Sequence, residues 1–176
     1  MRTKTEKILL VLKIIAILGA IGYSIVWGSQ LLTLVSSYIN PDWAKRTYEV
    51  DLKMFSVREQ SVWYYFFGMS INIVVSALKA IIWYVAYQLL QTFKLKTPFT
   101  WEVERKLESM AYLMLFVWII SSIFWKVYTY YLLQDTGIQL AASNSDEYLF
   151  MAGIIYIISQ VFKRGIEIEE ENHLTV

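Results

Sequence analysis

The sequence contains no cysteine, a single histidine and two prolines in 176 residues. Without cysteine the chain forms no disulfide, no thiolate metal site and no cysteine nucleophile, and one histidine cannot supply a histidine cluster. Sixteen Lys and Arg nearly balance fifteen Asp and Glu, so there is no broad basic surface of the kind that nucleic acid requires. These absences predict a protein that is not an enzyme, holds no metal and no cofactor, and does not bind nucleic acid directly.

Apolar residues dominate what is present. The composition is 57% hydrophobic, 16% aromatic and only 18% charged, which is too apolar for a soluble core of this size. Because a bilayer core of about 30 Å takes roughly 20 apolar helical residues, we expect four membrane spans, at about 8–34, 62–90, 109–133 and 146–163. The first is too long for a signal peptide, and the fourth is the weakest, with a short apolar run. The prediction is an all-α, four-helix bundle and a single transmembrane domain, 1–176.

Basic residues predict the orientation, because short cytoplasmic segments retain Lys and Arg. Nine of them lie at the N-terminus, in the link 91–108 and at Lys163 and Arg164, where the tail begins, against four in the loop 36–61. We therefore expect both termini in the cytoplasm (N-in/C-in), the loop 36–61 outside and the link 91–108 inside. The localisation that follows is a cytoplasmic membrane, crossed several times.

Turn and capping residues predict the helix boundaries outside the spans. The outer loop, which opens at Asn40, is expected to be ordered on the membrane surface, with a short helix. In the inner link, either Thr97 followed by Pro98, or Thr100, can cap a helix that leads into the third span. Acidic residues at 146 and 147 suit the start of the fourth helix, and Gly165 is expected to end it.

Ionisable residues within spans are functional candidates, because burying a charge at the bilayer centre is costly. Three lysines interrupt the spans: Lys13, Lys79 and Lys126. Each is near enough to a predicted membrane surface for its ammonium group to reach the headgroups, so snorkelling is the preferred interpretation. No Asp or Glu lies well inside a predicted span, which argues against the carboxylate relays of proton-coupled transport.

Small and polar residues recur every four positions in the first two spans, and such stripes let helices pack closely in lipid. The expected packing residues are Ala16, Ala20, Ser24 and Gly28 in the first span and Gly68, Asn72, Ser76 and Ala80 in the second. Asn72 is expected to form an interhelical hydrogen bond. The alternative is a pore or ligand groove lined by Asn72, Ser121 and Ser122.

The tail alternates apolar residues with acids. In GIEIEEENHLTV this pattern fits three interpretations: docking to a basic cytoplasmic partner, packing against the basic inner link, or simple solvation. His173 is expected to be a solvated tail residue, because one imidazole beside glutamates makes a poor metal site.

Two cytoplasmic motifs, TPFTWEVERKLESMAYL and VFKRGIEIEEENHLTV, resemble the bacterial domain-of-unknown-function family 2975, small membrane proteins of four predicted helices. The family's Pro-Phe motif and its closing Phe-basic-Gly-acidic segment correspond here to the following positions: Pro98, Phe99, Phe162, Arg164, Gly165, Glu170, Asn172 and Leu174 to Val176. His173 departs from the Asp that is common there. The resemblance implies no biochemical activity, but members are often encoded beside small helix-turn-helix regulators.

These observations lead to one preferred function and one alternative. We expect an uncharacterised bacterial membrane protein that acts as a binding or regulatory module for a cytoplasmic partner, such as a small helix-turn-helix transcription regulator. Its predicted partner-binding residues are Pro98, Phe99, Arg164, Gly165, Glu170 and Leu174. The alternative is a small transporter or pore component that uses Asn72, Ser76 and Lys79. The lipid bilayer is an expected partner in either case, and a homo-oligomer is left open.

Overall fold

The computed structural model describes residues 4–43, 52–93, 97–141 and 145–174, and it is all-α, as predicted. Its elements are α1 (Lys4–Ile39), α3 (Leu52–Gln60), α4 (Val62–Thr92), α5 (Trp101–Trp118), η1 (Ile119–Phe124), α6 (Trp125–Thr136) and α7 (Asp146–Leu174). Helices α5 and α6 are joined without a break by η1, a π-helical stretch, so that Trp101–Thr136 forms one long helical unit.

Four helical units in the described residues are long and apolar enough to cross a membrane, which confirms the predicted number of spans. They are α1, α4, the α5–η1–α6 unit and α7. Large apolar side chains on their outer faces are uncovered: Ile25 of α1 is 66% exposed and Phe150 of α7 is 70% exposed. Lipid can surround such apolar surfaces without the free-energy cost of exposing them to water, so the chain has the character of a multi-pass membrane protein.

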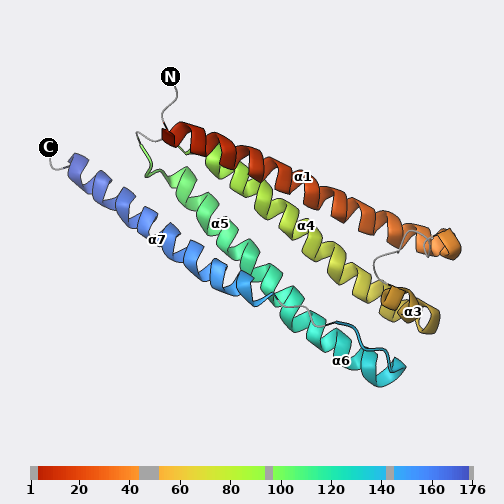
Figure 1. Cartoon of the computed structure of the whole chain (residues 1–176). Coiled ribbons are helices and arrows are strands. Elements are labelled where there is room, and N and C mark those ends of the chain that lie inside the picture. The colour runs from red at the N-terminus through yellow and green to blue at the C-terminus, as the bar shows by residue number, and fades with distance from the viewer. Residues whose placement is uncertain (1–3, 44–51, 94–96, 142–144, 175–176) are drawn as a thin grey trace.

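Helices that follow one another in the chain pack side by side (Figure 1). Helix α1 packs on α4, α4 on α5, and α5 on α7. The start of α1 and the end of α7 lie at the same end of the bundle, which we call the terminal end. The opposite, far end carries α3 and the turn after α6, where Gly137 adopts a left-handed conformation with φ of 69° and closes the helix.

The principal core lies at the far end, where α3 and the chain after α6 cover α4 and α6. Tyr128 of α6 is at its centre, with its hydroxyl donating to the Tyr64 carbonyl oxygen at 3.0 Å, and the Tyr64 hydroxyl bonds to Asp135. The buried members of the cluster are Met54, Val57, Tyr65, Met69, Ile71, Tyr128, Leu132 and Leu140. This core holds α4 and α6 together at the far end of the bundle.

Helix α7 begins beside the middle of its neighbours rather than at the far end of the bundle (Figure 1). Trp118, halfway along the Trp101–Thr136 unit, donates from Nε1 to Asp146 Oδ1 at 3.2 Å. The chain after Gly137 returns along α6, and the Ala141 carbonyl oxygen accepts from Trp125 Nε1 at 3.1 Å. The described residues between Gly137 and Asp146 are therefore not helical and lie along α6.

Two boundary predictions can be compared directly with the structure. Thr100 is the cap of α5, with its hydroxyl oxygen accepting from the Val103 N–H at 3.4 Å, which selects one of the two predicted alternatives. The predicted helix end at Gly165 is wrong, because α7 continues to Leu174. Gly165 sits where a neighbouring ring leaves no room for a larger side chain, so its role is close packing instead of termination.

Candidate functional site

The two motifs singled out in the sequence meet at the terminal end of the bundle. The Phe99 ring, just before α5, lies 5.1 Å from the Phe162 ring of α7, centroid to centroid. A Cβ atom at Gly165 would lie 2.9 Å from Phe99 Cδ1, so only glycine allows this approach. One turn further, Trp101 Nε1 donates to Glu170 Oε1 at 2.9 Å. We call Phe99, Trp101, Phe162, Gly165 and Glu170 the clasp.

The clasp fixes which side of the α7 C-terminal half is outward. Ile166 is 5% exposed, whereas Ile168 is 46% exposed. Glu169 and Glu170 are exposed as well. Because α7 stays helical here, the apolar and acidic residues of the tail separate into a packed side and an outward side that carries Ile168 together with acids.

The remaining predicted partner-binding residues lie around the clasp. Arg164 is exposed, and its Nη1 is 2.8 Å from Glu167 Oε2 within the same helix. Pro98 is partly buried beside Phe99. Leu174 is the last residue of α7, and its side chain, like that of His173, lies outside the described part, as do the basic residues Lys94 and Lys96 of the link. Trp101 lies within the first motif, TPFTWEVERKLESMAYL, but it is not among the predicted partner-binding residues.

A second candidate site is a polar cavity at mid-length of the helices. It has a volume of about 260 Å³, and its lining residues come from α4, η1, α6 and the chain around the start of α7. They are Ile71, Asn72, Val75, Lys79, Ser121, Trp125, Ala141 and Ser145. The cavity thus unites three residues of the predicted transporter or groove alternatives, Asn72, Lys79 and Ser121.

Hydrogen bonds define the polar groups of this cavity. Asn72 Nδ2 donates to the Gly68 carbonyl oxygen at 3.2 Å, within α4, and the Ser121 hydroxyl donates to the Val117 carbonyl oxygen. Next to the cavity, the Ser76 hydroxyl lies 2.6 Å from Gln30 Oε1 of α1, so the polar contact between these helices involves Ser76. Ser122 Oγ is buried and has no partner among the described residues. Single π-helical turns of this kind are frequent at functional sites.

Lys79 lies one turn before Trp83 in α4 and next to the start of α7. Its Nζ lies 5.2 Å from the centre of the Tyr148 ring and 5.9 Å from that of Tyr23, and Glu147 acts on it electrostatically. The rings of Tyr148 and Tyr23 therefore lie beside the Lys79 ammonium group, and snorkelling of this lysine stays a prediction. Asp146 and Glu147 are in the first turn of α7, as predicted, and both are exposed beside the middle of the neighbouring helix unit.

The structure places the two small-residue stripes only partly at helix contacts. In α1, Ala16 and Ala20 are buried, whereas Ser24 is exposed and a Cβ at Gly28 would meet nothing within 4 Å. A strict four-residue step advances by about 40° more than one helical turn, so the stripe leaves the contact.

The α1–α4 contact includes Gly19, which the stripe omits: a Cβ there would lie 2.5 Å from the Trp83 ring. In α4, Gly68 packs on Tyr128, Asn72 faces the cavity and Ser76 faces α1. Ala80 is partly buried. The second stripe therefore winds from the α6 side of the helix to the α1 side.

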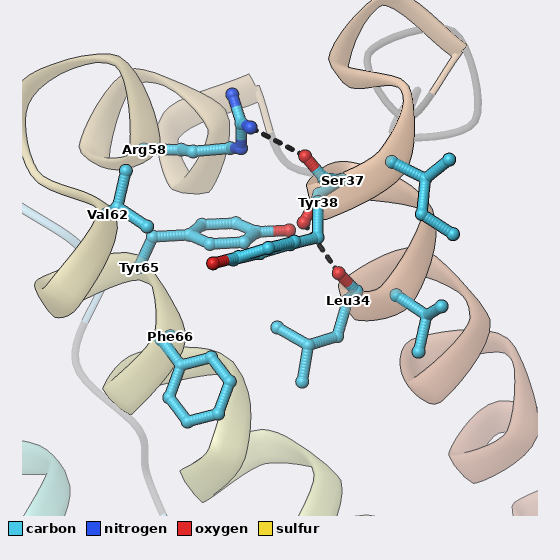
Figure 2. A pocket seen from close by; sticks show the side chains of 9 residues that line it. Leu34, Ser37, Tyr38, Arg58, Val62, Tyr65 and Phe66 are labelled. Carbon is cyan, nitrogen blue, oxygen red and sulfur yellow. Dashed lines mark hydrogen bonds between the residues drawn. The ribbon is translucent and has the colours of Figure 1, made fainter.

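A further cavity of about 300 Å³ lies at the far end, between α1, α3 and α4 (Figure 2). Its lining is mostly apolar, with Tyr38, Tyr65 and Phe66 prominent. The one charged group in the lining is Arg58, whose Nη2 donates to the Ser37 carbonyl oxygen at 2.6 Å (Figure 2). This guanidinium ties α3 to the end of α1.

The comparisons with known proteins identify one family. Residues 39–176 match the model of the family described as Protein of unknown function (DUF2975). The matched part contains α3 to α7, and with them the clasp and the mid-length cavity. It leaves out α1 up to residue 38, including Tyr23 and Gln30. No curated protein and no solved structure matches the chain significantly.

Proposed function

This chain belongs to the DUF2975 family, and from that premise we propose that it is a non-enzymatic membrane module that binds or regulates a cytoplasmic protein. A small helix-turn-helix transcription regulator is the kind of partner proposed. The terminal end of the bundle, with both chain ends, faces the cytoplasm of a bacterial cell in this proposal. The excess of basic residues in the termini and the inner link supports that orientation.

The observation that carries the proposal is the clasp. Two segments about seventy residues apart, which contain the motifs, pack together through Phe99, Phe162 and Gly165 and are tied by Trp101 and Glu170. The clasp holds the last turns of α7 as a helix beyond the apolar part of the bundle. Ile168 and the neighbouring acids then form an outward surface whose charge complements a basic protein.

Co-purification from native membranes tests the proposal. The variant Ile168→Lys combined with Glu169→Lys places positive charges on the outward surface without changing a clasp residue, and we expect it to lose a basic partner that the wild type recovers. Asp42→Lys, an exposed charge reversal at the far end, is the matched control and retains the partner. Recovery of the same proteins with all three forms, and an unchanged regulator activity after deletion of residues 165–176, would count against the proposal.

A second candidate function is a small transporter or pore component. The observation in its favour is that Asn72 and Lys79 line one cavity at mid-length of the bundle, with Ser76 beside it. Charged and polar groups inside membrane bundles commonly mark ion and substrate pathways. In liposomes, this candidate requires a solute flux that Asn72→Leu reduces, whereas an equal flux through wild type and variant argues against it.

A further inference from the structure

We propose that the mid-length cavity is a binding site for a small carboxylate anion, with Lys79 as its counter-charge. This goes beyond both candidate functions, because equilibrium binding needs neither a protein partner nor transport. Lys79 lines the cavity together with Asn72 and Ser145.

The cavity lies at the depth of the hydrocarbon core. Trp63 and Trp83 of α4 are separated by about 30 Å along the helix, one membrane thickness. The lining residues Ile71 to Lys79 fall between them, at about 12 to 24 Å from Trp63. A polar cavity at this depth is not solvated by bulk water, so its charged group needs a partner inside the bundle.

The groups around the cavity favour an anion over a cation. The Lys79 ammonium group repels cations and attracts carboxylates. Ser145, directly before α7, is in the lining, so the cavity lies next to the N-terminal end of that helix, where the helix dipole is positive. Asn72 uses one amide hydrogen for the Gly68 carbonyl oxygen, which leaves its second for a ligand.

The size of the cavity limits the ligand to a few heavy atoms. A volume of about 260 Å³ corresponds to roughly nine waters at about 30 Å³ each and is at or below the small end of ligand pockets. Ile71, Val75 and Trp125 form its apolar walls. These features suit a short-chain carboxylate, with its charged end at Lys79 and its alkyl part against the apolar walls.

Glu147 competes with such a ligand for the positive charge of Lys79. It acts electrostatically on Lys79 from the first turn of α7 but is not in the lining. Asp146, the other acid of that turn, accepts from Trp118. A bound carboxylate must therefore share Lys79 with Glu147, and removal of the Glu147 charge should strengthen binding.

Thermal unfolding of the purified full-length protein in nanodiscs, titrated with sodium acetate or propionate against sodium chloride at equal ionic strength, tests the site. A ligand that binds only the folded state raises Tm in a saturable way. With four heavy atoms, acetate can saturate no lower than tens of micromolar, roughly, so titrations extend to 100 mM. Acetamide, the uncharged isostere, is expected to give no saturable shift.

Variants make the test specific. We expect Lys79→Met to weaken acetate binding at least tenfold, whereas Lys13→Met, which removes another lysine within a span, leaves it within twofold. Glu147→Gln should tighten binding by about two- to fivefold, the effect of one charge pair that involves an exposed carboxylate; this readout stands even where Lys79→Met does not fold. An equal response to acetamide, an equal affinity in Lys79→Met, or no saturable acetate effect in either wild type or Glu147→Gln overturns the proposal.

Discussion

Gly165 lies against the ring of Phe99, so close that a Cβ atom on the glycine would come within 2.9 Å of Phe99 Cδ1. This contact joins the middle of α7 to the chain just before α5. It explains why a glycine occurs inside a helix that continues for nine further residues, to Leu174. The same approach places Phe162 on Phe99 and brings Glu170 to Trp101.

A pair of glycines in α7 tests this contact. Gly165→Ala forces the Phe99 ring to move, and we expect it to be less stable than Gly153→Ala by about 1–3 kcal/mol, the usual cost of overpacking. Gly153 is the matched control because a Cβ there would meet nothing within 4 Å, so its substitution gains helix propensity without a clash. Thermal unfolding in detergent measures both; equal stabilities would show that Phe99 yields freely.

The hydrogen bond between Trp101 and Glu170 is predicted to hold the end of α7. Trp101→Phe removes the indole donor and keeps an aromatic ring, so cleavage after residue 165 by a protease should become about two- to fivefold faster, as expected for one hydrogen bond to a charged group at an exposed site. Glu170→Gln should have a similar effect, and the double variant should add little. Additive effects would mean that the two side chains act separately.

The α1–α4 contact depends on Gly19 rather than on the strict four-residue stripe. A Cβ at Gly19 would meet the Trp83 ring at 2.5 Å, whereas Gly22, one turn later, has nothing within 4 Å. We predict that Gly19→Ala destabilises the protein by about 1–3 kcal/mol and that Gly22→Ala changes stability by less than about 0.5 kcal/mol. The reverse order in denaturation experiments would place a different face of α1 against α4.

The depth at which α7 starts can be measured with spin labels in nanodiscs. Leu149→Cys, in the first turn of α7 and 41% exposed, should carry a label that collides with oxygen far more than with a water-soluble nickel complex. Gln134→Cys, exposed at the end of α6, is the control and should show the opposite preference. If both labels report water, α7 begins at the membrane surface and the cavity is not at the depth inferred.

Hydropathy and capping chemistry predicted much of the fold, because they act locally. The four apolar segments, the helix cap at Thr100 and the acidic start of α7 all follow from residues close in sequence. The end of α7 was misjudged, because a glycine after basic residues resembles a helix stop unless the ring of Phe99 is known to lie beside it.

The sequence offered a groove with Asn72 and Ser121 as an alternative, but it did not predict that Ala141 and Ser145 complete the cavity, because that depends on the position of α7 along α5. That offset places Asp146 at Trp118 and Tyr148 at Lys79, and no local pattern encodes it. The signal in the sequence was the shortness of the fourth apolar run, with two acids immediately before it. Short hydrophobic segments of this kind occur where membrane helices are interrupted at binding sites.

Impermeant maleimide labelling of single cysteines on intact cells tests the proposed arrangement most directly, and the cysteine-free chain needs no background substitution. Gln134→Cys, at the far end, should react without permeabilisation. Asn172→Cys, at the terminal end, should react only after the membrane is opened. Labelling of Asn172→Cys on intact cells would place the clasp outside the cytoplasm and contradict the account.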